Sequence, residues 1–466
     1  MKSSTLLCSF LLLAELTAGY LFDRDFSLLK KENQGYVKFR GERKSKQTVR
    51  KSNSQSKKVT NNFDMVHTGY LYTLNITIGS NKEPVVVQVD TGSADFWIIG
   101  SNNSWCSWTS EGQGKYTEDT SRGSLHDCSL YGTFDSSKSD TWVNTGEPLD
   151  IVYVDGTGAN CTLGTDNIII DGLEIDDCYI AVSDEASENY GVLGIGPVNL
   201  EVTARNADPF VYSNLPLTMK NQGLISKNTY SIYLDEFTDT NTAAILFGGI
   251  DHNKYVGDLG LLPIASANEK IDVTLNSISI SNGTGKKYTF ASGAATALLD
   301  TGTGKTLLPT EVVRALSSYV GRDDGSNVMA NCDDIADVDL TFEFLGHEVT
   351  VPLLGFVQGK TGDECILGIQ DSDTIILGDT FLSGAYFVAD LEANQVALAV
   401  ANLDSVDENI EPIVDTIPSA TTAPNYSSSQ TASSLSAITA SSSSLLSHSS
   451  NDTISAVKLV KSMYFV

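Results

Sequence analysis

Two copies of one motif, 210 residues apart, constrain this chain more than any other feature. "VVVQVDTGSADFW" (85–97) and "ALLDTGTGKTLLP" (297–309) each run from an apolar strand into Asp-Thr-Gly. A single Asp-Thr-Gly is ordinarily a turn, because Asp and Thr cap the turn and Gly accepts a positive φ. Each copy is echoed later by two apolar residues and a glycine, at 192–194 and 376–378. The repeat therefore predicts two related β lobes that face each other.

The region between about 63 and 403 is typical of an all-β protein. Short runs rich in β-branched and aromatic residues alternate with Gly, Asn, Asp and Ser, and the clearest helix pattern is "PTEVVRALSSYV" (309–320). A chain of 466 residues exceeds one compact core. We expect an N-terminal lobe at 63–255 and a C-terminal lobe at 256–403.

Facing lobes would bring Asp90 and Asp300 together as an acid/base pair. Two carboxylates at ~4 Å repel by about 4 kcal/mol at an effective dielectric of 20, which separates their ionisations by roughly three pH units. The pair then holds one proton over an acidic pH range. The charged acid can activate a water, while the protonated acid hydrogen-bonds a carbonyl and later protonates the leaving amine. This chemistry requires no metal or cofactor, and we predict neither.

These residues resemble the pepsin-like aspartic proteases over about 63–403, the family in which a shared-proton dyad is best known. Both loops match that family's D-[TS]-G-[TS] pattern. The resemblance implies a bilobal, all-β acid protease fold with a central active-site cleft, and Asp90 and Asp300 as catalytic residues. It also implies supporting roles for the loop residues: Thr91 and Thr301 lock the loops together, and Ser93 and Thr303 bind the outer carboxylate oxygens beside Gly92 and Gly302.

"LDIVYVDGTGA" (149–159) resembles the family's flap, a hairpin that closes over substrate. The resemblance implies that Trp97 hydrogen-bonds Tyr153 and that Tyr153, Asp155, Gly156 and Thr157 contact substrate. From the residues alone, an alternative is open for each: Tyr153 could be an ordinary core residue, and Asp155 could be a plain turn residue. The chain departs from the family at Val154, where glycine is usual, and at Gly304, where Ser or Thr is usual.

Within that family the chain looks most like the fungal yapsins and the barrier-type protease. "GLISKNTYSIYLDE" and "ILFGGIDHNKYVGDL", the dibasic propeptide and the Ser/Thr tail carry this likeness. It implies cleavage next to Lys or Arg, with Asp155 receiving a Lys that precedes the scissile bond. We therefore predict an aspartic endopeptidase with an acid pH optimum and a basic-residue preference.

Both ends of the chain differ in composition from the body. Lys2, the apolar run "LLCSFLLLAEL" and small residues after it predict a secretory signal peptide at 1–19. Residues 20–58 are basic, with little periodic pattern and three dibasic pairs, which is typical of the propeptide of a zymogen; a disordered basic arm is the alternative. Residues 404–466 are Ser/Thr-rich and predict a disordered, O-glycosylated tail. Lys458 and Lys461 interrupt the final apolar stretch, so the signal for a lipid anchor is poor.

Charge narrows the class of partner. The formal net charge is −28, with an excess of basic residues in 1–58 and of acidic residues elsewhere. Such a surface repels nucleic acid and anionic membranes and attracts cationic peptides. We expect a secreted monomer acting on peptides or proteins with basic residues, and we leave retention at the cell surface or wall open.

The cysteines and sequons agree with export. Six cysteines follow the signal peptide and allow 15 pairings; we expect neighbour pairing, as Cys106–Cys128, Cys161–Cys178 and Cys332–Cys365. No Cys or His spacing suits a metal. Six sequons fit a glycoprotein: Asn75, Asn102, Asn160, Asn282, Asn425 and Asn451.

Other functional classes are weakly supported. The chain contains neither the H-E-x-x-H pattern of metalloproteases nor the G-x-S-x-G pattern of serine hydrolases. "TGTGKT" (301–306) resembles the end of a phosphate-binding loop, but Leu299 stands where that loop needs a glycine. The serious alternative is a catalytically silent glycoprotein of the same fold that binds peptides at the cell surface.

Overall fold

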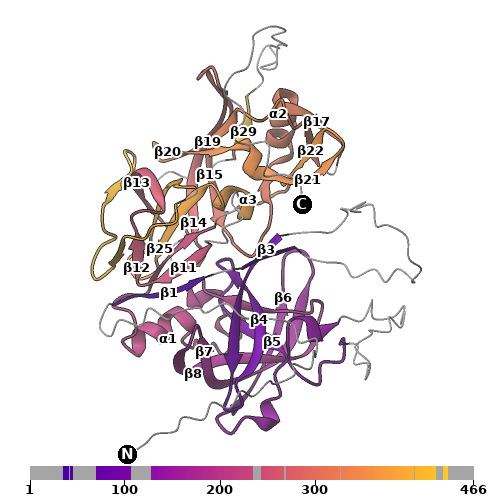
Figure 1. The fold of residues 1–466 in the computed structure, drawn as a ribbon, viewed down its shortest axis with the longest axis vertical. Coiled ribbons are helices and arrows are strands. Elements are labelled where there is room, and N and C mark those ends of the chain that lie inside the picture. Colours follow the sequence, from indigo (N-terminus) through magenta and orange to yellow (C-terminus); the bar gives the residue numbers. More distant parts are fainter. Residues whose placement is uncertain are drawn as a thin grey trace, which may run out of the picture.

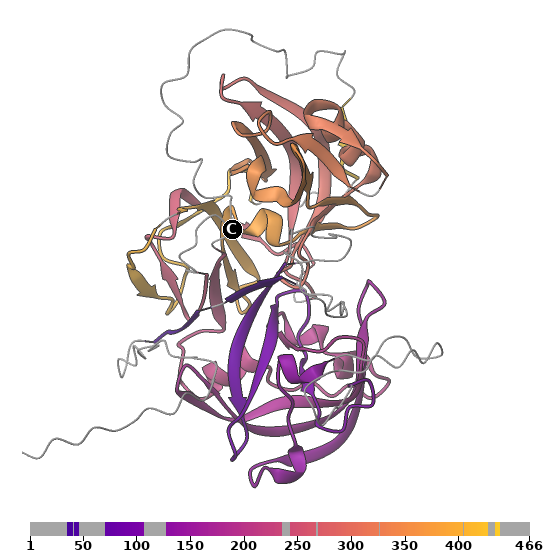
Figure 2. The same cartoon turned by 45° about the vertical axis from the view of Figure 1, so that its right-hand side comes forward.

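The computed structural model describes residues 35–40, 42–45, 70–106, 127–234, 243–266, 269–325, 327–403, 405–426 and 434–438. The predicted signal peptide, most of the predicted propeptide with its dibasic pairs at 50–51 and 57–58, and Asn451 lie outside these residues. The described chain forms two β lobes, one drawn in indigo to magenta and the other in pink through orange to yellow (Figures 1 and 2).

The N-terminal lobe is built on one eight-stranded sheet in the order β2-β3-β4-β9-β5-β8-β7-β6. Its strand β7 alternates more buried and less buried residues with a period of two, whereas the central strands β5 and β9 are buried throughout. The strands are β2 (Glu42–Ser45), β3 (Tyr70–Ile78), β4 (Glu83–Asp90), β5 (Phe96–Ile99), β6 (Val143–Val152), β7 (Gly158–Ile170), β8 (Leu173–Ala186) and β9 (Gly191–Gly194).

The C-terminal lobe contains a large sheet in the order β20-β19-β14-β15-β24-β16-β23, with β29 paired to β15, and a smaller one in the order β17-β18-β22-β21. The large sheet comprises β14 (Asp272–Asn282), β15 (Lys287–Leu299), β16 (Thr306–Leu308), β19 (Val338–Phe344), β20 (His347–Pro352), β23 (Ile369–Asp371), β24 (Ile375–Leu377) and β29 (Ser436–Ala437). The small sheet comprises β17 (Gly321–Asp323), β18 (Val328–Asn331), β21 (Val357–Thr361) and β22 (Glu364–Leu367).

A seven-stranded sheet, in the order β1-β11-β10-β25-β26-β13-β28, takes strands from both halves of the chain. It comprises β1 (Val37–Arg40), β10 (Thr229–Tyr233), β11 (Ala244–Phe247), β13 (Tyr255–Pro263), β25 (Ala385–Asp390), β26 (Gln395–Ala401) and β28 (Ala420–Thr422). A two-stranded ladder joins β12 (Gly249–Asp251) to β27 (Ile410–Pro412).

Helices are few and short. The predicted helix is α2 (Thr310–Val320), which buries Val312, Val313, Leu316 and Val320 on one face. The others are α1 (Leu215–Asn221), α3 (Asp379–Leu382) and the 3₁₀ turns η1 (Cys128–Leu130), η2 (Ser136–Lys138), η3 (Val198–Leu200), η4 (Val202–Arg205) and η5 (Leu353–Phe356). No helix among the described residues is both long and apolar enough to span a bilayer.

The two halves repeat one pairing at the motif. β4 runs parallel to β9, with Val89 opposite Leu193, and β15 runs parallel to β24, with Leu299 opposite Leu377. These are the strands that carry the Asp-Thr-Gly loops and their later apolar-apolar-Gly echoes. The duplication inferred from the sequence is thus a duplication of strand pairing.

Part of the segment predicted as a poorly patterned propeptide is built into the sheets. β1 pairs with β11, and β2 pairs with β3. Phe39 is buried against Phe247, with ring centroids 5.8 Å apart. A strand of four residues at a sheet edge needs only one buried side chain, so its periodic pattern was too short to detect.

The prediction of a disordered tail from 404 onward is wrong for its first part. Residues 405–426 and 434–438 contribute β27, β28 and β29, because Ile413, Ile417, Ala423 and Leu435 are buried. Lys254 donates to the carbonyl of Ser405 at the start of this segment. The Ser/Thr-rich composition concealed these widely spaced apolar residues.

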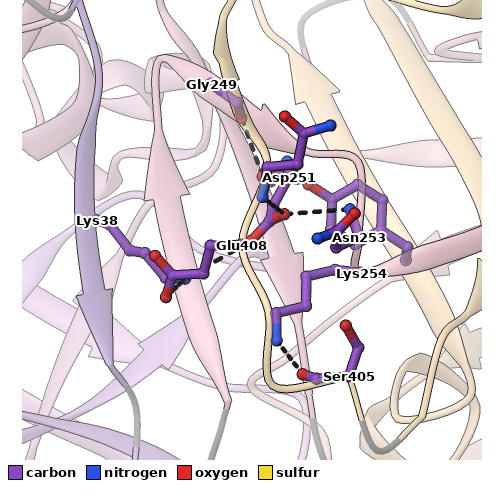
Figure 3. A network of polar contacts seen from close by, with 10 residues as sticks. Lys38, Gly249, Asp251, Asn253, Lys254, Ser405 and Glu408 are labelled. Atoms are coloured by element: carbon purple, nitrogen blue, oxygen red, sulfur yellow. Dashed lines mark hydrogen bonds and ion pairs between the residues drawn. The ribbon is translucent and has the colours of Figure 1, made fainter.

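This C-terminal segment also contacts β1. Lys38 Nζ lies 2.8 Å from Glu408 Oε1 and 3.8 Å from Asp251 Oδ2, and Figure 3 shows Lys38 and Glu408 pointing toward one another. The other oxygen of Asp251 accepts hydrogen bonds from the backbone N–H groups of Asn253 and Asn409. The predicted propeptide and the predicted tail therefore meet at one pair of carboxylates.

Two of the three expected disulfides are present. Cys106–Cys128 and Cys332–Cys365 join α-carbons 5.5 and 5.1 Å apart. The third pairing, Cys161–Cys178, is wrong, and both thiols are free and buried.

The register of the β7–β8 hairpin explains the missing bond. Cys161 lies opposite Ser183, whereas Cys178 lies opposite Asp166, five positions further along the ladder. Five residues of strand span roughly 16 Å, and a disulfide tolerates an α-carbon separation of at most about 7 Å. The two thiols also belong to different hydrophobic clusters, Cys161 with Trp97 and Cys178 with the main core.

Candidate active site

The two motif acids stand at the ends of buried strands. Asp90 is the last residue of β4, and Asp300 follows β15 directly. Their side chains are only 5% and 7% exposed. Each loop is tied to the strand that echoes it, since Ile195 N donates to Asp90 O and Asp300 N donates to Leu377 O.

The threonines after the two acids join the loops by a reciprocal set of hydrogen bonds. Thr91 Oγ1 donates to the carbonyl of Leu299 at 2.8 Å, and Thr301 Oγ1 donates to the carbonyl of Val89 at 2.9 Å. Each hydroxyl also accepts from the backbone N–H of the other threonine. Both threonines are fully buried, so each hydroxyl is satisfied away from water and the relative position of the loops is fixed.

Each carboxylate is held by the same two kinds of donor, a glycine N–H and a side-chain hydroxyl. The N–H of Gly92 donates to Asp90 Oδ1 at 2.7 Å, and Ser93 Oγ donates to Asp90 Oδ2 at 2.5 Å. In the second loop, the N–H of Gly302 donates to Asp300 Oδ1 at 2.8 Å, and Thr303 Oγ1 donates to Oδ2 at 2.7 Å. The four donors fix both carboxylate planes and leave the two Oδ1 atoms on the facing sides.

The glycines are required by the closeness of the two acids. A Cβ added to Gly302 would lie 2.4 Å from Asp90 Oδ1 and 3.0 Å from Asp300 Oδ1, and a Cβ added to Gly92 would lie 2.6 Å from Asp300 Oδ1. Both Oδ1 atoms are therefore within hydrogen-bonding reach of a common point. The structure brings together the residues that the sequence separates by 210 positions.

Burial and the neighbouring carboxylate of Asp300 raise the pKa of Asp90 well above its ordinary value. The physical causes are desolvation of the charged form and repulsion between like charges. The pair consequently keeps a proton to higher pH than a solvent-exposed aspartate would.

The hairpin predicted to be the flap joins β6 to β7. Trp97 Nε1 donates to the hydroxyl of Tyr153 at 2.8 Å, the contact that the family resemblance implied. The Asp90 carboxylate lies close enough to contribute, after burial, to a raised pKa of Tyr153. Tyr153 therefore projects from the hairpin toward the first acid.

The tip of this hairpin is an ordered turn. Asp155 Oδ1 accepts from the N–H of Thr157 at 3.0 Å and from its hydroxyl at 2.6 Å, and Gly156 takes a φ of +83°. The turn interpretation of Asp155 thus holds for Oδ1, which makes both of these bonds, and the residue is exposed. Val154, beside it, is 99% exposed.

Two supporting features have no motif and were missed in the sequence. Gln88, two residues before Asp90 on β4, donates from Nε2 to the carbonyl of Gly302 at 2.9 Å. Alternation along β4 places Gln88 on the same face as Asp90, which is the one signal that could have found it.

The second missed feature is a buried acid network beside the first loop. Asp95 accepts from the hydroxyl of Tyr212 and from Val202 N, and Glu201 accepts from Tyr212 N. Glu201 is fully buried, and burial raises its pKa to about 9, with the Asp95 carboxylate adding to the shift. Nothing in the sequence around Glu201 indicates this position.

The arrangement suits a water-activating acid pair. Two carboxylates with fixed planes face a common point, the pKa of Asp90 is raised by burial and by its neighbour, and a hairpin that carries a tyrosine approaches Asp90. Among the described residues, no group of three or more His, Cys, Asp or Glu side chains is placed to hold a metal ion.

Comparison with known sequences gives a consistent result. Residues 71–401 match the family model described as eukaryotic aspartyl protease. Aspartic proteinase 3 of Saccharomyces cerevisiae is 34% identical, over 76% of this chain and 74% of its own length. Aspartic proteinase yapsin-3 of the same yeast is 32% identical over 76% and 71%, and secreted aspartic protease 8 of Candida albicans is 35% identical over 72% and 77%.

Proposed function

Because the chain belongs to the eukaryotic aspartyl protease family, we propose that Asp90 and Asp300 are its catalytic pair and that it cleaves peptide bonds next to basic residues at acid pH. The class, an aspartic-type endopeptidase, follows from the family. The proposal concerns which residues act, at what pH, and on which peptides.

The facing Oδ1 atoms carry the proposal for the dyad. A water at their common point can lose a proton to the ionised member and attack the scissile carbonyl, which the protonated member hydrogen-bonds. The proton then passes to the leaving amine, and the pair returns to its starting state. Since the single proton belongs to the pair, we assign it to neither residue.

The pH dependence of activity that we propose rests on the same acid pair. Activity requires the pair to hold one proton and one charge, so it is lost when both acids are protonated and again when both are ionised. Thr91 and Thr301 fix the loops, and Ser93 and Thr303 stabilise the charged oxygens.

The preference for basic residues is supported by position and charge. Asp155 is exposed at the tip of the hairpin whose Tyr153 reaches toward the dyad, and only one of its oxygens is used by the turn. A Lys of the substrate that met the other oxygen would gain a charged hydrogen bond of about 1.5–3 kcal/mol. The net charge of −28 favours the approach of cationic peptides.

We also propose secretion, with cleavage of the signal peptide and of a basic propeptide. The composition of residues 1–58 supports this, and one similar yeast protein is named a secreted aspartic protease.

The test uses one peptide with a central Lys and a matched peptide with Leu in its place. The wild-type protein should cut the Lys peptide at pH 4–5, Asp300→Asn should abolish cutting, and Asp155→Asn should reduce kcat/KM for Lys about tenfold while sparing Leu. Glu174→Asn, on the exposed edge of β8, is the control and should change neither. Binding of the Lys peptide without cutting at every pH would instead identify a silent peptide-binding glycoprotein.

A further inference from the structure

The strand register around the second loop places Lys305 on the same face as Asp300. Leu299 lies opposite Leu377, and Leu377 lies opposite Thr306, so these three residues form one row across β15, β24 and β16. All three are fully buried. Side chains alternate between faces along a strand, so Asp300 and Lys305, one residue beyond this row, project from the opposite face.

The spacing between the strands gives the distance from Asp300 to Lys305. Residue 378 lies between Asp300 and Lys305 in the continuation of this row, and it is a glycine against which the backbone of residues 303–305 packs. A Cβ there would lie 2.3 Å from the carbonyl of Lys305 and 2.1 Å from that of Thr303. Two strand spacings separate the α-carbons of Asp300 and Lys305 by about 10 Å, the length of roughly three residues of an extended peptide.

The ammonium group of Lys305 lacks a carboxylate partner within the described parts of the chain. Its Nζ donates to the amide oxygen of Gln370 at 3.1 Å, and Gln370 lies opposite Leu307 on this same face. The side chain is half-buried, and desolvation alone lowers its pKa. By contrast, Lys38, Lys227 and Lys287 each pair with a carboxylate.

A half-buried cation without a counter-charge is unusual in a chain of net charge −28. Partial burial strengthens its attraction for an anion, because the interaction is screened less than on an open surface. Gly304 adds no side chain beside it, and its carbonyl is held by Gln358 Nε2 at 2.7 Å. The position is therefore rigid and charged.

We propose that Lys305 is a specificity-determining residue that binds a Glu or Asp side chain of the substrate about three residues from the scissile bond. This rests on the proposed dyad, from which the distance is counted. The site would then recognise two substrate side chains of opposite charge: a basic residue next to the scissile bond and an acidic residue about three residues away.

The experiment scans one peptide with a fixed central Lys. Glu, Gln or Lys is placed in turn at each of the four positions on either side of the scissile bond, and kcat and KM are measured for the wild-type protein, Lys305→Met, Lys305→Arg and Lys305→Glu. Lys286→Met is the matched control, because Lys286 lies next to the turn at the other end of the β14–β15 hairpin from Asp300.

The wild-type protein should prefer Glu over Gln about tenfold in kcat/KM at one position two to four residues from the scissile bond, chiefly through KM. Lys305→Met should remove this preference, Lys305→Arg should keep it, and Lys305→Glu should transfer it to Lys. Lys286→Met should behave as wild type.

Two results would overturn the proposal: rates for Glu and Gln within twofold at every position, or a Glu preference that survives in Lys305→Met. The comparison of Glu and Gln peptides uses the wild-type protein alone. The proposal can therefore be refuted even if a variant misfolds. Failure of the dyad proposal has a different signature, because cutting would then persist in Asp300→Asn.

Discussion

At the scale of single residues, the acid pair and Glu201 are all buried but differ in how their carboxyl oxygens are hydrogen-bonded. Asp90 and Asp300 face each other and accept bonds from Gly92, Ser93, Gly302 and Thr303. Glu201 instead accepts one backbone N–H through Oε2, while its buried Oε1 has no hydrogen-bond partner among the described residues. A carboxyl in such surroundings is stable in the fold only when it is protonated.

Glu201 should therefore make the folded state less stable as the pH rises. Burial raises its pKa from 4.5 to about 9. Between these values the folded state keeps a proton that the unfolded state releases, so the free energy of unfolding falls by up to about 1.4 kcal/mol per pH unit. The contribution is fully present below about pH 4.5 and is lost as the pH approaches 9. Glu201→Gln should flatten the decline of Tm with pH.

Thermal unfolding between pH 4 and pH 8 measures this effect. The variant and the wild type should unfold at similar temperatures at pH 4, and the variant a few degrees higher at pH 7. The exposed Glu174→Gln should run parallel to the wild type. Parallel curves for Glu201→Gln would show that this carboxyl does not limit stability.

The sequence identified the residues whose chemistry forms a local pattern. Asp90, Asp300 and their hydroxyl neighbours stand in two matching loops. Gln88, Glu201 and Lys305 were not identified, because their roles depend on strand pairing and packing between residues distant in the sequence.

At the scale of elements, the register of one hairpin decides the state of two cysteines. β7 and β8 place Cys161 and Cys178 five positions apart on the ladder and in different clusters. The sequence supplied the count of cysteines but not this register, which is set by the continuous pairing of Cys161–Asp166 with Cys178–Ser183. Composition alone could not have shown whether the six cysteines form two disulfides or three.

Both thiols should be inert in the folded protein. Burial raises the pKa of Cys161 and of Cys178, and neither is exposed to reagent. Iodoacetamide should label neither residue in native conditions and both after denaturation without reductant, as read by peptide mass spectrometry. Cys106 and Cys332 are the internal controls and should be labelled only after reduction. A 161–178 disulfide peptide in the mass map would contradict the register.

At the scale of the whole molecule, one sheet collects strands from almost the full length of the chain. β1, from the predicted propeptide, is paired at its edge, and β28, from the predicted tail, is paired at the other. The bilobal body was predictable from the duplicated motif. The incorporation of both ends was not, because each contributes only a few buried residues within a polar segment.

The contact between Glu408 of the predicted tail and Lys38 of β1 predicts that a change in the tail alters the stability of β1. Glu408→Gln weakens the pairing with Lys38, whose ammonium group then keeps, among the described carboxylates, the more distant Asp251. In the uncleaved protein, we expect amide hydrogens of Val37–Arg40 to exchange several-fold faster at pH 7, consistent with a partly exposed ion pair worth about 1 kcal/mol or less. Glu411→Gln, which removes the partner of His252 on the same segment, should leave their exchange unchanged. Equal protection in both variants would show that backbone pairing alone holds β1.

β29 determines from which side the molecule can be tethered. It pairs with Ala291 and Ser292 of β15, and Asp300 follows eight residues later, roughly 26 Å along an extended strand. A bead, tag or matrix joined beyond residue 438 would pull on the middle of β15, at Ala291 and Ser292. Immobilised in this way, the protein would keep roughly eight strand residues of β15 between its anchoring point and Asp300.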